Sequence, residues 1–220
     1  ARFFIVNEAE KMNANAANAL LKTLEEPSPT SHIILVTSRP NALLQTIRSR
    51  CQTFRFSPVA AAEIESFLLK SGKFSADDAS LLSTLSAGSI GKALELNLDA
   101  FREQRETILN AVESLLSGKQ RSRLLKTAEE MSDAKKKDQY APFLNILQTV
   151  VHDIWTLSVD PDSENVVNSD IVGRLTRMST ISDRTKLASW LLMIEDLREK
   201  FSVNLNKKIA TDALFMKMAA

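Results

Sequence analysis

Asn7 and Glu8 are the first side chains along the sequence that could take part in phosphate chemistry. They come directly after the apolar run of residues 3–6. A glutamate in that place can orient a water for attack on a phosphate, and an aspartate before it would hold magnesium. Asn7 stands where that aspartate would be, and a neutral amide is a poor substitute for a carboxylate on magnesium. Taken alone, an acidic residue at a strand end is more often structural than catalytic.

Two hydroxyl side chains end the next apolar run. Thr37 and Ser38 close the run that starts at Ile33, and hydroxyls in this place could sense a γ-phosphate or a polarised water. Without further context, the commoner role of such hydroxyls is to cap the turn that follows.

A pair of arginines follows a short predicted helix. Arg48 and Arg50 flank Ser49, and Cys51 comes next. An arginine on an exposed edge can reach the nucleotide of a neighbouring subunit and stabilise charge on the transferring phosphoryl group. An isolated surface arginine more often forms a salt bridge, so these two residues alone do not decide between the roles.

A short α/β segment must position these residues. The periodicity predicts a strand at 2–6, a helix at 12–26, a strand at 33–37, a short helix at 43–48 and a strand at 51–56. Asn13 can cap the first helix, and Pro27 ends it. The continuous apolar run at 2–6 predicts a strand buried on both faces. This alternation is typical of a parallel α/β sheet, of which we expect only the second half.

After Pro58 the strand patterns end and helices follow. Three short helices are predicted, one of them capped by Ser75 and closed by Gly88. Longer helices follow, with apolar stripes at Ile108, Leu109, Val112, Leu115 and Leu116, at Leu144, Leu147, Val151, Ile154 and Trp155, and at Leu187, Trp190, Leu191, Ile194, Leu197, Phe201 and Leu205. We therefore predict a partial α/β domain at 1–57, a three-helix domain at 58–98 and an all-α domain at 99–220, with a loop at 160–168.

Composition favours a mostly helical protein and excludes several functional classes. Only five of the 220 residues are glycine, too few for a many-turned β-sandwich or glycine-lined phosphate loops. The net charge of +1 excludes an overall field that attracts nucleic acid or anionic lipid. The single cysteine, Cys51, excludes internal disulfides and cysteine-rich zinc sites, and no apolar run is long enough to span a bilayer. The lysine run at 135–137 is expected at a solvated helix end, with DNA contact as the alternative.

Taken together and in order, the residues from 3 to 56 closely resemble the clamp-loader branch of the AAA+ family. The segments NAANALLKTLEEP and LLQTIRSRC are its most specific parts. The resemblance implies that Arg50, in the Ser-Arg-Cys triplet, is an arginine finger for a neighbouring subunit. It also implies that Thr37 or Ser38 is the first sensor. The fold would be part of an AAA+ α/β domain, then a lid at 58–98 and an oligomerisation collar at 99–220.

Departures from the family pattern imply loss of hydrolysis. Asn7 and Glu8 would form a degenerate Walker B element, and Gly91 stands where hydrolysing subunits carry the second-sensor arginine. Lys92 could substitute if the register shifted by one residue. A subunit that keeps its finger but lacks these groups resembles the delta-prime class of this family, in which ATP and Mg²⁺ are held by the neighbouring subunit and not by this chain. The family's P-loop and zinc cysteines precede Walker B, so we expect the chain to start within a domain.

The resemblance also implies partners. They would be gamma/tau-type and delta subunits, the sliding clamp indirectly, and primer-template DNA within the complex, in the cytoplasm and away from membranes. Two alternatives stay open. The first is a gamma/tau-type ATPase subunit that tolerates Asn7, and the second is a helical adaptor that retains an AAA+ remnant.

Overall fold

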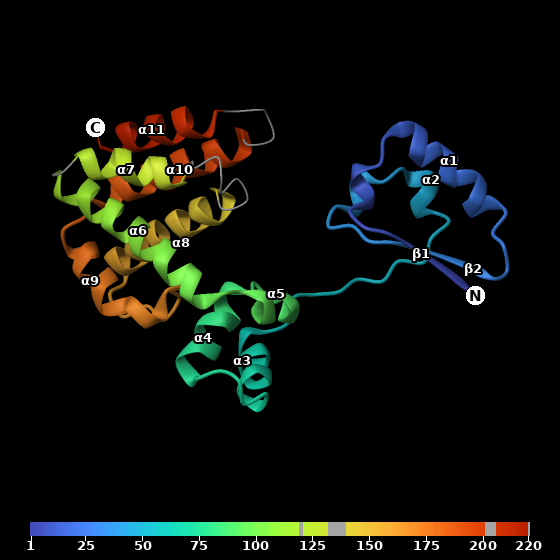
Figure 1. Cartoon of the computed structure of the whole chain (residues 1–220), viewed down its shortest axis with the longest axis horizontal. Coiled ribbons are helices and arrows are strands. Elements are labelled where there is room, and N and C mark those ends of the chain that lie inside the picture. Colours follow the sequence, from blue (N-terminus) through green and yellow to red (C-terminus); the bar gives the residue numbers. More distant parts are fainter. Residues whose placement is uncertain (119–120, 132–139, 201–205, 220) are drawn as a thin grey trace. The chain divides into compact units, whose positions relative to one another are not determined.

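The computed structural model describes residues 1–118, 121–131, 140–200 and 206–219. The lysine run at 135–137 and two members of the last predicted stripe, Phe201 and Leu205, lie outside these ranges. The described residues fall into two compact units, Ala1–Ser57 and Pro58–Ala220. Figure 1 shows strands in the first unit and helices in the second.

The first unit contains a two-stranded parallel sheet, β1 (Arg2–Val6) and β2 (Ser31–Leu35), with Phe4 opposite Ile33. The helix α1 (Ala14–Glu25) connects the two strands. As predicted, the Asn13 side chain caps α1, because its carbonyl oxygen accepts a hydrogen bond from the Ala16 N–H at 2.8 Å.

Short helical turns complete the first unit. These are η1 (Ala9–Lys11), η2 (Pro40–Ala42) and α2 (Gln45–Arg48). The α2 helix packs against α1, and Ile47 is its buried anchor. The turn after α2 carries residues 49–51, so the arginine pair sits at the end of this helix.

Three expectations about the strands need correction. The second strand is displaced toward the N-terminus, from 33–37 to Ser31–Leu35, so Thr37 and Ser38 lie beyond its end. Residues 51–56 form no strand, because a strand needs a hydrogen-bonding partner and the sheet here consists of β1 and β2 alone. The first strand is not buried on both faces, since Phe3 is 65% exposed and Ile5 is 69% exposed. These side chains are exposed because few helices pack against this two-stranded sheet.

The second unit begins with three short helices around a small apolar core. They are α3 (Ala61–Lys70), α4 (Ala76–Leu85) and α5 (Ile90–Glu95). Ser75 caps α4, as predicted, by accepting a hydrogen bond from the Asp78 N–H at 3.2 Å. Gly88 has a φ of +84°, and a Cβ there would lie 2.3 Å from Pro58 Cβ. Glycine is therefore required at position 88, which packs against the first residues of this unit. The Val59 N–H donates to Gly88 O at 2.9 Å.

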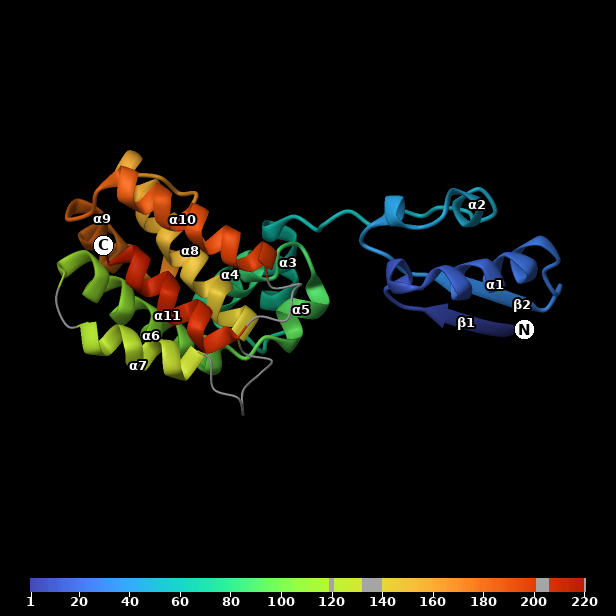
Figure 2. The same ribbon diagram turned by 90° about the horizontal axis from the view of Figure 1, so that it is seen from above.

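Longer helices form the rest of the second unit. They are α6 (Leu98–Ser117), α7 (Arg121–Met131), α8 (Tyr140–Val159), α9 (Val172–Thr180), α10 (Arg184–Glu199) and α11 (Lys207–Met218), with the turn η4 (Ser169–Ile171) before α9. The central helix α8 packs against α6, α9 and α10, as Figures 1 and 2 both show. The predicted loop at 160–168 is confirmed.

The predicted apolar stripes form the core of this unit. Their buried members include Val112 of α6, Leu147 of α8 and Ile194 of α10. Trp190 is 1% exposed, and its indole N–H donates to the Met218 carbonyl at 3.0 Å. The short and long helices are also joined by an ion pair of 2.6 Å between Arg102 of α6 and Asp78 of α4. This arginine holds the pKa of Asp78 below its usual value.

Candidate functional site

The end of β1 presents Asn7 and Glu8, the two residues predicted to form a degenerate Walker B element. Asn7 is exposed, and Glu8 has a left-handed backbone with φ 50° and ψ 48°, an uncommon conformation for a residue other than glycine. The Glu8 carboxylate is ion-paired with Lys11 at 2.6 Å. A neutral amide beside a carboxylate already paired with a lysine is a poor donor set for Mg²⁺.

The predicted first-sensor residues lie beside the end of β1 and are held by Glu10. The Ser38 hydroxyl donates to Glu10 Oε1 at 3.2 Å, and Thr37 Oγ1 accepts from the Arg39 N–H at 3.0 Å. Hydrogen bonding by the Thr37 side chain is the main cause that lowers the pKa of Glu10 below its usual value. The two strand ends are also joined by their backbones, since Ala9 N–H donates to Val36 O at 2.9 Å.

Glu10 is a site residue that the sequence analysis missed. Its side chain is only 5% exposed, and its Oε2 atom is buried without a hydrogen-bond partner among the described residues. A usable clue existed, because the carboxyl ends of neighbouring parallel strands lie at the same edge of a sheet. An acidic residue shortly after β1 was thus well placed to meet hydroxyls shortly after β2.

The predicted arginine finger is on the surface of the first unit. Arg50 lies two residues beyond the end of α2, and its side chain is 36% exposed. Its Nη2 atom is 2.8 Å from Glu25 Oε1, and its Nη1 atom donates to the Thr46 carbonyl at 3.0 Å. The neighbouring Cys51 is half-buried, and burial raises the pKa of its thiol. A thiol kept neutral in this way is a packing group rather than a nucleophile.

The structure does not bring Arg50 to this chain's own Walker B residues. Asn7 and the sensor hydroxyls lie at the edge of the sheet where α1 begins, whereas Arg50 is paired with Glu25, the last residue of α1. The 12 residues of this helix span about 18 Å at 1.5 Å per residue. The two halves of the candidate site are therefore at opposite ends of one helix.

The second-sensor position lies in the second unit, at the start of α5. Gly91 and Lys92 are both exposed, and the Lys92 N–H donates to the Ser89 hydroxyl that caps the helix. A Cβ at Gly91 would meet nothing closer than Ser89 Oγ at 4.0 Å. A larger side chain would fit there, so the glycine is not required by packing.

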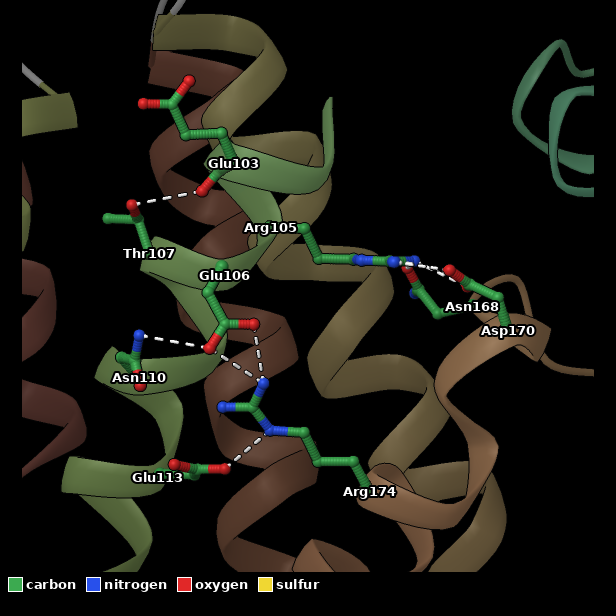
Figure 3. Close-up of polar contacts among 9 residues, drawn as sticks. All are labelled: Glu103, Arg105, Glu106, Thr107, Asn110, Glu113, Asn168, Asp170 and Arg174. Carbon is green, nitrogen blue, oxygen red and sulfur yellow. Dashed lines mark hydrogen bonds and ion pairs between the residues drawn. The ribbon is translucent and has the colours of Figure 1, made fainter. Parts of the chain in front are cut away.

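A buried ionic network in the second unit was also missed by the sequence analysis (Figure 3). Arg105 of α6 is 4% exposed, and its two terminal nitrogens contact Asp170 of η4 at 2.7 and 2.5 Å. It also donates to Asn168 Oδ1 at 3.2 Å, and Asn168 donates in turn to the fully buried Asp153. These contacts fix the loop before η4 against α6 and α8, which is a structural role.

A separate ionic cluster in Figure 3, more exposed than the first, joins α6 to α9. Arg174 contacts Glu106 at 2.7 Å through Nη1 and Glu113 at 2.8 Å through Nε. The two carboxylates raise the pKa of Arg174, with Glu113 as the larger cause. Among the described residues, no group of three or more His, Cys, Asp or Glu could hold a metal ion. None of the described helices has the length and apolar character needed to cross a membrane.

Comparison with known proteins gives consistent relatives. A family model described as "DNA polymerase III, delta subunit" matches residues 1–60. DNA polymerase III subunit delta′ of Bacillus subtilis is 28% identical over 93% of this chain and 62% of its own length. The corresponding delta′ subunit of Pseudomonas aeruginosa is 31% identical over 98% of this chain and 65% of its own length. The chain thus spans somewhat less than two thirds of these relatives. A gamma subunit from Buchnera aphidicola is 35% identical over 47% of this chain and 32% of its own length.

Proposed function

We propose, from its similarity to delta′ subunits of DNA polymerase III, that the chain belongs to this family and is a non-hydrolysing clamp-loader subunit. In this proposal Arg50 acts as an arginine finger on ATP and Mg²⁺ held by a neighbouring gamma/tau-type subunit. The complex, which would also contain a delta subunit, would load the sliding clamp onto primer-template DNA in the cytoplasm.

The observation that carries this proposal is the position of Arg50. Its guanidinium is partly exposed on the outside of the first unit, at the end of α1 remote from Asn7. An arginine that stabilises transferring phosphate must come within hydrogen-bond distance of it. From this place Arg50 is better suited to a nucleotide on another subunit than to one bound beside its own Walker B residues.

The lack of hydrolysis by this chain is supported by its own nucleotide-facing residues. Asn7 brings no charge to a metal, and Glu8 is occupied by Lys11. Gly91 has no side chain with which to contact a phosphate, although space for one exists. Two departures in the same direction, at Asn7 and at Gly91, are more easily explained by a lost activity than by one tolerated variant.

The helices of the second unit are proposed to serve in assembly. Large apolar side chains remain exposed on or directly after them, including Leu192 at 73%, Ile181 at 66% and Ile209 at 66%. A ring of like domains would remove such surface from water and gain about 25 cal/mol for each Å² of apolar area buried. Removing residues 99–220 should therefore abolish assembly of the complex, which size-exclusion chromatography with the partner subunits would detect.

The test of the finger is Arg50→Ala in the assembled complex with the full-length subunit. We expect ATP turnover at the neighbouring site to fall by up to about 10³-fold, the range typical of a lost finger. Arg48→Ala is the matched control, since Arg48 is also exposed and lies two residues away. Turnover that is unchanged in the Arg50 variant, or reduced equally in both variants, would contradict the proposal.

The alternative, a gamma/tau-type ATPase, has one observation in its favour. The match to a gamma subunit covers 47% of this chain at 35% identity. ATP hydrolysis by the purified full-length subunit, with no partner present, would favour this alternative. The delta′ proposal predicts none.

A further inference from the structure

We propose that Glu25 restrains Arg50, and that a nucleoside triphosphate on a neighbouring subunit must displace the Glu25 carboxylate before Arg50 can act. This inference rests on the proposed function of Arg50 and adds a regulatory contact to it. The restraint is built from two elements, since Glu25 ends α1 and Arg50 follows α2.

The geometry engages both terminal nitrogens of the guanidinium. Nη2 lies 2.8 Å from Glu25 Oε1, and Nη1 donates to the Thr46 carbonyl at 3.0 Å. These nitrogens belong to the fork with which arginine grips a phosphate through two parallel hydrogen bonds. A phosphate approaching Arg50 therefore finds part of that fork directed at protein acceptors.

The restraint is weak enough to be exchanged. The Arg50 side chain is 36% exposed and that of Glu25 is 53% exposed. Ion pairs with this much contact with water stabilise a protein little, because water and salt screen them. A triphosphate carries several negative charges and can outcompete one screened carboxylate, so the contact can delay the arginine without holding it permanently.

The charge of Glu25 distinguishes two possible roles for this residue, restraining Arg50 or positioning it for catalysis, because the two roles predict opposite changes in turnover. If Arg50 bound a phosphate while still paired with Glu25, the carboxylate and the phosphate oxygens would both contact the same guanidinium group. Two anions at that separation repel each other, and both compete for the same cation. Neutralising Glu25 should therefore favour contact between Arg50 and the phosphate and raise turnover. If Glu25 instead positioned Arg50 for catalysis, the same change would lower turnover.

The experiment is Glu25→Gln in the assembled complex, with ATP turnover measured at subsaturating ATP. Glutamine keeps the shape of the side chain and removes its charge. We expect kcat/KM to rise by about two- to fivefold, the range that corresponds to an exposed ion pair. Glu26→Gln is the matched control, because it removes the same charge from the adjacent exposed residue, and it should leave kcat/KM unchanged. An unchanged or lower value in Glu25→Gln, or an equal rise in Glu26→Gln, would overturn the restraint.

A double variant distinguishes failure of the restraint from failure of the finger. With Arg50→Ala already present, Glu25→Gln should have no further effect on turnover, because nothing remains to be released. A rise that persists in this background would overturn the restraint. If Arg50→Ala alone leaves turnover unchanged, the proposed function fails. If Arg50→Ala lowers turnover but Glu25→Gln matches the wild type, only the restraint fails.

Discussion

The two units of this chain divide chemistry from stability. In the first unit, residues 1–57, the buried apolar residues are Ala9, Ala17 and Ile47 alone, and about half of its large apolar side chains remain exposed. The second unit buries a continuous core drawn from α6, α7, α8, α9, α10 and α11. The residues that could meet a phosphate lie mainly in the unit with the smaller core. The candidate site therefore lies in the unit with little buried core, and most of the buried core lies in the helical bundle.

This contrast can be tested because both tryptophans, Trp155 and Trp190, belong to the second unit. Their fluorescence reports unfolding of the helical bundle to which they belong. Substitutions in the second unit should shift the urea transition seen by tryptophan, whereas substitutions in the first unit should leave it unchanged.

The largest expected effect is that of Asp170→Ala. This change leaves Arg105, which is 4% exposed, without its carboxylate partner. Breaking a buried ion pair on one side typically costs about 3 kcal/mol or more, because the remaining charge is desolvated and uncompensated. Asp162→Ala, in the exposed loop, is the control and should cost little. Equal urea midpoints for the two variants would show that the buried network does not stabilise the bundle.

A smaller effect is expected for Gly88→Ala. The new Cβ would lie 2.3 Å from Pro58 Cβ, and the residue has a φ of +84°. Gly72→Ala is the matched control, since Gly72 has a φ of +67° but open space around it. We expect a loss of about 1 kcal/mol at Gly72 from the left-handed backbone alone. At Gly88 we expect about 2–3 kcal/mol, because the entering chain must also shift. Similar losses at both positions would mean that the contact with Pro58 has no cost.

The smallest effect is expected for Asn7→Asp in the first unit. Restoring one carboxylate should produce no measurable ATP hydrolysis by the full-length subunit alone, because Gly91 still contributes no side chain at the predicted second-sensor position. The tryptophan transition should also stay where it is. Hydrolysis by this single variant would show that the missing carboxylate at position 7 is the only obstacle to activity, and would contradict this prediction.

Local patterns in the sequence predicted local structure well. Asn13 and Ser75 were recognisable as helix caps because the acceptor and the N–H it satisfies are three residues apart. The strand expected at 51–56 was wrong, because a strand depends on a partner elsewhere in the chain. Alternation of apolar and polar residues indicates which side chains would share a face, but not whether another strand lies beside the segment.

The candidate site shows the same division. Arg50, Thr37 and Ser38 were found from motifs, and their partners were not. Glu25 is 25 residues from Arg50 in the sequence, Glu10 is 28 residues from Ser38, and Asp170 is 65 residues from Arg105. Such pairs are set by the packing of separate elements, and no spacing rule within one segment reveals them.

The strand β1 leaves one of its two sides free for pairing. It pairs with β2 along one side only, and Phe3, Phe4 and Ile5 are exposed along it. A free row of backbone N–H and C=O groups flanked by aromatic side chains is the arrangement from which sheets grow by adding strands of other molecules. This edge of β1 is therefore the place where a further strand would add to the sheet.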